Sequence, residues 1–114
     1  MSSSFTVEWT ETASSDLDRI LDFIEQDRPM AALRVLANIE RRAAALRTHP
    51  QRGRIVPELA ALQMRSYREL VITPYRLLYR IAERMVYVLG VFDGRRNLED
   101  LLLERILSEG SSPT

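Results

Sequence analysis

Six of the arginines between residues 65 and 96 are the side chains best suited to hold an oxyanion. They are Arg65, Arg68, Arg76, Arg80, Arg95 and Arg96. A guanidinium donates forked hydrogen bonds to a carboxylate or a phosphate, and it keeps its proton. The group could therefore contact the acidic side chains of a partner. Glu69 lies in the same stretch, so a cross-strand ion pair or a solvated face is the plainer interpretation of each arginine.

The alternation expected of a strand sorts residues 76–82 onto two faces. One face carries Leu77, Tyr79 and Ile81, and we expect it to pack beneath helices. The other carries Arg76, Leu78, Arg80 and Ala82, and we expect it to look toward solvent or a partner. Arg76 and Arg80 would lie roughly 13 Å apart along an extended strand. That distance is too long for both arginines to hold one phosphate. It would suit contacts with two separate groups along a bound partner chain.

Other residues that carry chemistry are few. All sixteen basic residues are arginines and there is no cysteine, which excludes a Schiff-base lysine, a thiolate nucleophile, a thiolate metal site and a disulfide. The one histidine, His49, precedes a proline after a predicted helix, which favours a helix-end or loop role over catalysis. We expect sheet packing for the four tyrosines and a core position for Trp9. No metal or cofactor is predicted.

Charge and hydropathy limit the classes of partner. Sixteen acidic residues balance the sixteen basic ones, so the chain is a poor candidate for binding nucleic acid by bulk electrostatics. No apolar run reaches the length of a membrane span, and the N-terminus lacks the pattern of a signal peptide. We therefore expect a cytoplasmic protein that contacts no membrane and does not bind DNA directly by itself.

The elements that must position these residues follow from the periodicity of the apolar side chains. A strand is predicted at residues 5–9, a helix at about 11–27, and a second helix from Pro29 to about Thr48, forming an antiparallel hairpin. A loop covers residues 49–65, with one possible helical turn at 58–62.

Three strands follow, at residues 66–72, 76–82 and 85–92, with connections that suit an antiparallel meander. Asn97 could cap a closing helix whose leucines form an apolar stripe. The predicted fold is α+β, in one domain at residues 5–107, with disordered tails at residues 1–4 and 108–114.

This order of elements, together with several short motifs, resembles the RelE/ParE superfamily of toxins from type II toxin–antitoxin systems. The first helix carries Ala13, Asp16-Leu17 and Ile20, and the loop after the hairpin carries His49-Pro50 and Gly53. The strands carry Arg68-Glu69-Leu70, Pro74-Tyr75-Arg76, Tyr79-Arg80 and Val86-Tyr87-Val88-Leu89, and Gly94-Arg95-Arg96 follows them. The resemblance covers about residues 5–107 and implies a compact toxin held inactive by a cognate antitoxin.

RelE-type members of the superfamily are endoribonucleases that cleave mRNA on the ribosome. Such cleavage needs a base, an acid for the leaving oxygen and cations for the developing charge. The resemblance carries Arg76 over as a catalytic turn arginine, and Arg95 or Arg96 as a later one. Glu69 could serve as the base. The strand lysines of the RelE pattern have no counterpart here, and no tyrosine follows Tyr87, so the acid–base pair is incomplete.

ParE-type members lack those catalytic groups and share the Asp16-Leu17 and Arg95-Arg96 patterns of this sequence. Their function is inhibition of DNA gyrase, which is a binding activity and needs no hydrolytic residues. The resemblance therefore implies a gyrase inhibitor that contacts antitoxin or target through the six arginines. RelE-type cleavage of mRNA, with the ribosome and mRNA as partners, is the alternative. A non-toxic relic that only binds antitoxin is a third possibility.

Overall fold

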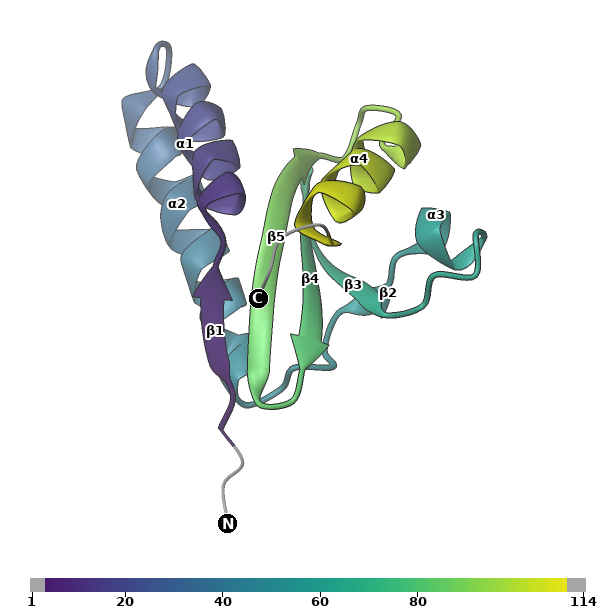
Figure 1. Cartoon of the computed structure of the whole chain (residues 1–114). Coiled ribbons are helices and arrows are strands. Elements are labelled where there is room, and N and C mark those ends of the chain that lie inside the picture. Colours follow the sequence, from purple (N-terminus) through teal and green to yellow (C-terminus); the bar gives the residue numbers. More distant parts are fainter. Residues whose placement is uncertain (1–3, 111–114) are drawn as a thin grey trace.

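The structure, a computed structural model, describes residues 4–110, and it confirms the α+β fold that the sequence predicts. A central sheet has the helical hairpin on one face and a closing helix on the other (Figure 1). In chain order the elements are β1 (Thr6–Trp9), α1 (Glu11–Glu25), α2 (Pro29–Ala44), the 3-10 turn η1 (Ala45–Arg47), β2 (Arg54–Ile55), α3 (Pro57–Ala60), β3 (Tyr67–Ile72), β4 (Tyr75–Ala82), β5 (Met85–Asp93) and α4 (Glu99–Gly110).

The hairpin forms where the sequence predicts it, because its ends carry helix-start residues. Thr10 caps α1, its side-chain oxygen accepting a hydrogen bond from the backbone N–H of Ala13 at 3.1 Å. Pro29 opens α2, where its missing N–H has no helical partner to lose. The second helix tightens into η1 before His49, so its predicted end near Thr48 is confirmed.

The sheet contains five strands in the order β1-β5-β4-β3-β2. The predicted meander is confirmed, since β3, β4 and β5 pair antiparallel in succession. The N-terminal strand β1 pairs parallel with β5, and the helical hairpin supplies the long crossover connection that a parallel pair requires. The two-residue strand β2 was not predicted from the sequence; it pairs with β3 through Arg54 opposite Glu69 and Ile55 opposite Arg68.

The hairpin face of the sheet holds the first hydrophobic core. Leu77 and Tyr79 of β4 are fully buried there, and Ile81 packs at its border. They lie against Ala13 and Leu17 of α1 and the apolar side of α2. Trp9 is half-buried against the same core. The packing predicted for this face of β4 is therefore confirmed.

The sequence predicts that the opposite face of β4 looks toward solvent or a partner. This prediction is wrong for two of its residues, because other parts of the chain cover them. Leu78 is 1% exposed and belongs to a second core, while the Arg76 side chain is only 12% exposed. The covering residues belong to α3, to α4 and to the residue just before each of these helices: Val56, Leu59, Leu98, Leu102 and Ile106. Strand alternation identifies the face, but it does not predict that the apolar stripe of the closing helix folds over it.

A buried polar link joins α1, β5 and α4. The register of β4 against β5 shifts between Leu78 and Tyr79, which leaves Leu89 as an extra residue in β5. The Asp16 carboxylate, 4% exposed, accepts hydrogen bonds from the backbone N–H of Val91 at 3.0 Å and from Arg105 at 2.6 and 3.1 Å. Arg105 also donates to the carbonyl of Leu89 at 2.8 Å. Asp16 thus accepts the hydrogen bond of a β5 backbone N–H at a point beyond the end of the β1–β5 pairing.

The closing helix α4 extends to Gly110, three residues beyond the predicted end of the domain at residue 107. Residues 108–110 are therefore helical and not part of a disordered tail, and the rest of the predicted tails, residues 1–3 and 111–114, lies outside the described residues. Ser4, described as an exposed residue before β1, has no regular secondary structure. Across residues 4–110, no helix has both the length and the apolar character needed to cross a membrane.

Candidate functional site

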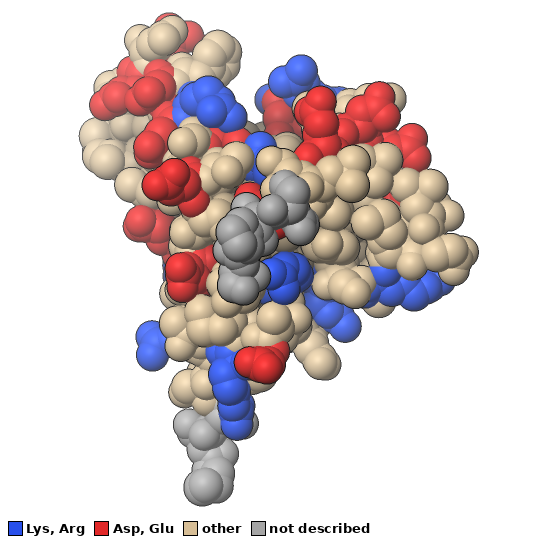
Figure 2. Space-filling view, viewed as in Figure 1, with Lys and Arg blue, Asp and Glu red and all other residues tan. Residues whose placement is uncertain are grey.

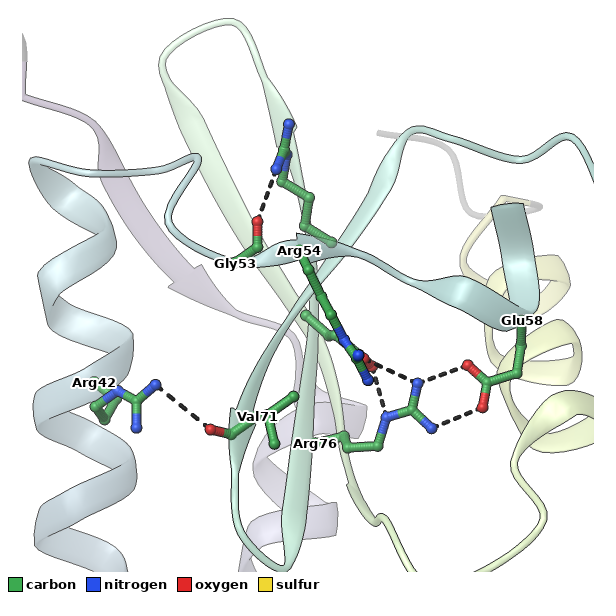
Figure 3. A network of polar contacts seen from close by, with 8 residues as sticks. Arg42, Gly53, Arg54, Glu58, Val71 and Arg76 are labelled. Atoms are coloured by element: carbon green, nitrogen blue, oxygen red, sulfur yellow. Dashed lines mark hydrogen bonds and ion pairs between the residues drawn. The ribbon is translucent and has the colours of Figure 1, made fainter. Parts of the chain in front are cut away.

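Arg76 is the centre of a network of four charged side chains (Figure 3). Its Nε and Nη2 donate to the two carboxylate oxygens of Glu69, at 2.7 and 3.0 Å. Its Nη1 and Nη2 donate to the two oxygens of Glu58, at 2.7 and 2.6 Å. Arg54 donates from Nε to Glu69 at 2.7 Å. Two positive and two negative groups are joined, so the network carries no net charge.

Three neighbouring strands and the short helix α3 position this network. Glu69 and Arg54 face each other across the β2–β3 pair, and Arg76 follows on the adjacent strand β4. Glu58 comes from α3, in the segment between β2 and β3. Hydrogen bonding from Arg76 is the main cause that lowers the pKa of Glu58 below its usual value, and the same contact raises the pKa of Arg76. Glu58 is therefore ionised at neutral pH.

Tyr79 ties the loop after η1 to the sheet from the hairpin side. Its hydroxyl donates to the carbonyl of Pro50 at 2.7 Å and accepts from the backbone N–H of Gly53 at 2.9 Å. Burial raises the pKa of this phenol. A side chain at position 53 would meet the Tyr79 hydroxyl and the Glu69 carbonyl, because a Cβ there would lie 2.7 and 2.4 Å from their oxygens. Tyr79 therefore packs and stabilises, as expected from the sequence.

The remaining predicted site residues do not form one surface. Arg68 lies on the hairpin face of β3 and donates to the carbonyl of Gly53 at 2.7 Å. Arg80 lies on the α4 face, with its guanidinium carbon 4.9 Å from the centre of the Tyr87 ring. Arg65 is exposed in the segment before β3. Each of these arginines therefore lies in a different environment from Arg76.

Arg95 and Arg96 lie at the far end of β5, in the segment before α4. Arg95 is exposed and forms an ion pair with Asp93 at 2.8 Å, and hydrogen bonds from Arg95 lower the pKa of Asp93 to about 2. Arg96 is exposed, and its backbone N–H donates to the carbonyl of Asp93 at 3.2 Å. Both side chains face solvent, but the Arg95 guanidinium is held in a two-point contact with the Asp93 carboxylate, at 2.9 and 2.8 Å.

Two adjoining grooves open beside Arg95, with volumes of about 380 and 410 Å³. The first lies between the hairpin and the β3–β4 turn, and the second lies between α1 and α4 over the end of β5. Phe23, Ile24, Tyr75 and Arg95 line both grooves. Phe23 is 77% exposed, so its apolar ring adds to the solvent-facing lining of both grooves.

The comparison with known families decides what this fold is. Residues 7–98 match the family described as the ParE toxin of type II toxin–antitoxin systems, parDE. The chain belongs to this family. The matched residues run from within β1 to the residue before α4, so among the described elements α4 alone lies wholly outside the match.

Individual relatives of this ParE-family toxin agree with the match. The chain is 35% identical over 86 residues to the protein named Toxin RelE2 of Caulobacter vibrioides, an alignment that covers 75% of this chain and 90% of that protein. Its fold is similar to that of a chain in a structure of the chromosomal ParDE system from P. aeruginosa, with a TM-score of 0.65, 23% identity, and coverage of 81% and 98%.

A second solved structure is the toxin–antitoxin complex RelBE2 from Mycobacterium tuberculosis. There the TM-score is 0.53 and the identity 26%, with 79% of this chain and 91% of that chain covered. Proteins named after ParE systems and proteins named after RelE systems thus both appear among the matches, and a shared fold does not decide between their functions.

The geometry of the toxin bears on the chemistry of the candidate RNase residues. Glu69, the candidate base, is 1% exposed and holds two arginines. Arg76 is paired on both edges of its guanidinium. Neither group can reach an RNA phosphate unless the network opens. The exposed His49 lies at the end of η1, where it shares a hydrogen bond with Thr48, so the expected helix-end role is confirmed.

The sequence did not identify Glu58 and Arg54 as members of the Arg76 network, or Phe23 as a groove residue. It also did not predict the buried pair of Asp16 and Arg105. The available signal was weak. The pattern around Glu58 indicates one helical turn, and Asp16 belongs to a motif of the family resemblance; neither signal predicts an ion pair. Asp16 and Arg105 lie far apart in the chain, so no sequence periodicity predicts their contact.

Proposed function

We propose that this ParE-family toxin inhibits DNA gyrase and is neutralised by a cognate antitoxin. The observation that carries the proposal is the closed ion network around Arg76. A general base must reach the proton that it removes, and a buried carboxylate that neutralises two arginines is poorly placed for that task. Inhibition of gyrase by binding needs no such group. The match to the ParE toxin family supports the same choice.

RelE-type cleavage of mRNA on the ribosome is the second candidate. The observation in its favour is the 35% identity to a protein named Toxin RelE2. Arg76 together with Arg95 or Arg96 would then supply the cations, and Glu69 the base. This mechanism requires both Glu58 and Glu69 to release Arg76, and no tyrosine beyond Tyr87 supplies the acid.

Two assays on the purified toxin separate these functions. We expect the toxin to block the supercoiling of relaxed plasmid by DNA gyrase and to increase the yield of cleaved DNA. We expect ribosome-bound mRNA in a translation extract to stay intact, because the base and the cation are held by ion pairs. Gel electrophoresis of the plasmid and primer extension on the mRNA measure the two outcomes.

Arg76→Ala provides the control for the second assay. If the wild-type chain cleaves mRNA and Arg76→Ala does not, the gyrase proposal is wrong and the RelE-type function is correct. If the chain affects neither gyrase nor mRNA but binds the antitoxin, it is a relic that has lost its toxicity.

For the antitoxin we propose docking along the two grooves beside Arg95. The grooves combine apolar side chains at Phe23, Ile24 and Tyr75 with the cations Arg28 and Arg95. This chemistry suits an amphipathic segment that carries carboxylates, in helical or extended form. Arg80 lines neither groove, so Arg95 is the better of the two arginines to test.

Arg95→Glu is expected to weaken binding of the cognate antitoxin by about tenfold. The substitution places a negative charge beside Asp93 and within both grooves, so it repels the carboxylates of the docking segment. Isothermal titration calorimetry measures the change. The matched control is Arg34→Glu, the same charge reversal at an exposed position of α2. Equal losses for the two variants would show that net charge, not the groove, determines affinity.

A further inference from the structure

Arg76 is oriented by the fold so that one edge of its guanidinium points away from the sheet toward α3. Glu69 holds the inner edge through Nε and Nη2. The aliphatic stem lies along Gly94, where an added Cβ would be 3.1 Å from Cγ and Cδ of Arg76. The outer edge, Nη1 and Nη2, meets Glu58 in a two-point contact (Figure 3). A planar pair of N–H donors in this geometry is a general receptor for oxyanions.

The two carboxylates on Arg76 differ in how firmly they are fixed. Glu69 is 1% exposed, lies within β3 and also receives Arg54. The Glu58 side chain is 29% exposed and belongs to the four-residue helix α3. Val56 and Leu59 beside it are fully buried. The backbone of α3 is thus anchored. The Glu58 side chain can leave Arg76 by rotation about its own bonds, which breaks its two hydrogen bonds to Arg76 but leaves the helix in place.

We propose that Glu58 is an internal substitute for a carboxylate of a partner protein, and that the partner's Asp or Glu side chain displaces it from Arg76. Exchange of one carboxylate for another conserves both the neutral charge of the network and its hydrogen bonds. A polyanionic nucleic acid fits less well. A nucleic acid brings a charged phosphate at every nucleotide and needs several cations in a row, whereas a partner protein can present one carboxylate to the single exposed edge of Arg76.

Binding of an external carboxylate to Arg76 is coupled to the release of Glu58. A ligand that binds only when Glu58 has left Arg76 has its affinity reduced by the small fraction of molecules in that open state. Removal of the Glu58 carboxylate makes the open state permanent, so the affinity of Arg76 for an external carboxylate must rise. This holds whether or not the toxin acts on gyrase, so its test involves neither gyrase, ribosome nor antitoxin.

The test uses the full chain and fluorescein-labelled hexaglutamate, with binding followed by fluorescence anisotropy at low ionic strength, where surface charges are least screened. We expect Glu58→Ala to bind hexaglutamate about tenfold more tightly than the wild type. The matched control is Glu40→Ala, which removes the same charge from an exposed position of α2 and is expected to change affinity less than about twofold. An equal gain in the two variants would overturn the proposal.

Two further arms identify the site and the ligand. Adding Arg76→Gln to Glu58→Ala should abolish the gain. If that double variant does not fold, the Nε–Hε NMR signal of Arg76 in Glu58→Ala gives the same information: it should shift when hexaglutamate is added, and an unmoved signal refutes the proposal. A labelled hexauridylate replaces hexaglutamate in the last arm. A gain for hexauridylate without one for hexaglutamate would assign the site to phosphates and overturn the choice of a carboxylate.

Discussion

Asp16→Ala is expected to lower the free energy of unfolding by about 3–5 kcal/mol, because it removes the buried polar link between α1, β5 and α4. The substitution leaves Arg105, whose side chain is 15% exposed, without its carboxylate. It also leaves the backbone N–H of Val91 without an acceptor. Because a domain of this size is stable by only about 5–15 kcal/mol, the variant should be close to unfolding at 37 °C. Urea denaturation followed by circular dichroism measures the change.

Figure 2 shows acidic side chains gathered over α1, the helix that carries Asp16. Asp18 of the same helix is exposed and provides a matched control. Asp18→Ala should change the free energy of unfolding by less than about 0.5 kcal/mol. Adding Arg105→Met to Asp16→Ala removes the orphaned charge and should restore part of the lost stability. If Asp16→Ala and Asp18→Ala were equally stable, the buried link would not contribute to the fold.

Glu69→Gln is expected to lower the free energy of unfolding by about 3 kcal/mol. The carboxylate is 1% exposed and neutralises Arg54 and Arg76 together, so an amide at this position leaves the network with excess positive charge. Glu58 compensates only Arg76. The midpoint of thermal or urea unfolding reports the loss, with Glu40→Gln at an exposed site of α2 as the control of equal charge change.

The same variant separates a structural role for Glu69 from a catalytic one. A base that acts on RNA in an open site can be replaced by glutamine with little effect on stability, because water solvates its neighbours. A Glu69→Gln chain that was as stable as the wild type, yet had lost an mRNA-cleaving activity, would contradict the structural role described above. Loss of stability without any such activity in the wild type agrees with it.

The order of the main elements was predictable because short-range signals determine it. Thr10 and Pro29 mark the starts of two helices, and the alternation at residues 76–82 marks a strand with two distinct faces. These signals depend on residues only a few positions apart. The family resemblance rested on the same local motifs, and the match over residues 7–98 confirms it.

The candidate site was predicted less well, because a site depends on contacts between distant residues. The sequence identified Arg76 and Glu69, and offered a cross-strand ion pair as the plainer explanation. It did not predict that Glu58 would complete the pairing or that Arg68 would lie on the opposite face of the sheet. Whether an arginine is free or neutralised depends on which loops fold over it, and loop positions have no periodic signal.

The order of residues along the chain was enough to predict the class of fold, the family, and the absence of lysine and cysteine chemistry. Folding then divides the arginine-rich stretch among a closed ion network, a hairpin-side contact and an exposed pair beside two grooves. The physical reason is that helix and strand periodicity assigns each side chain to a face, whereas burial and pairing depend on what covers that face. Here α3 and α4 cover it, and they place Glu58 on Arg76.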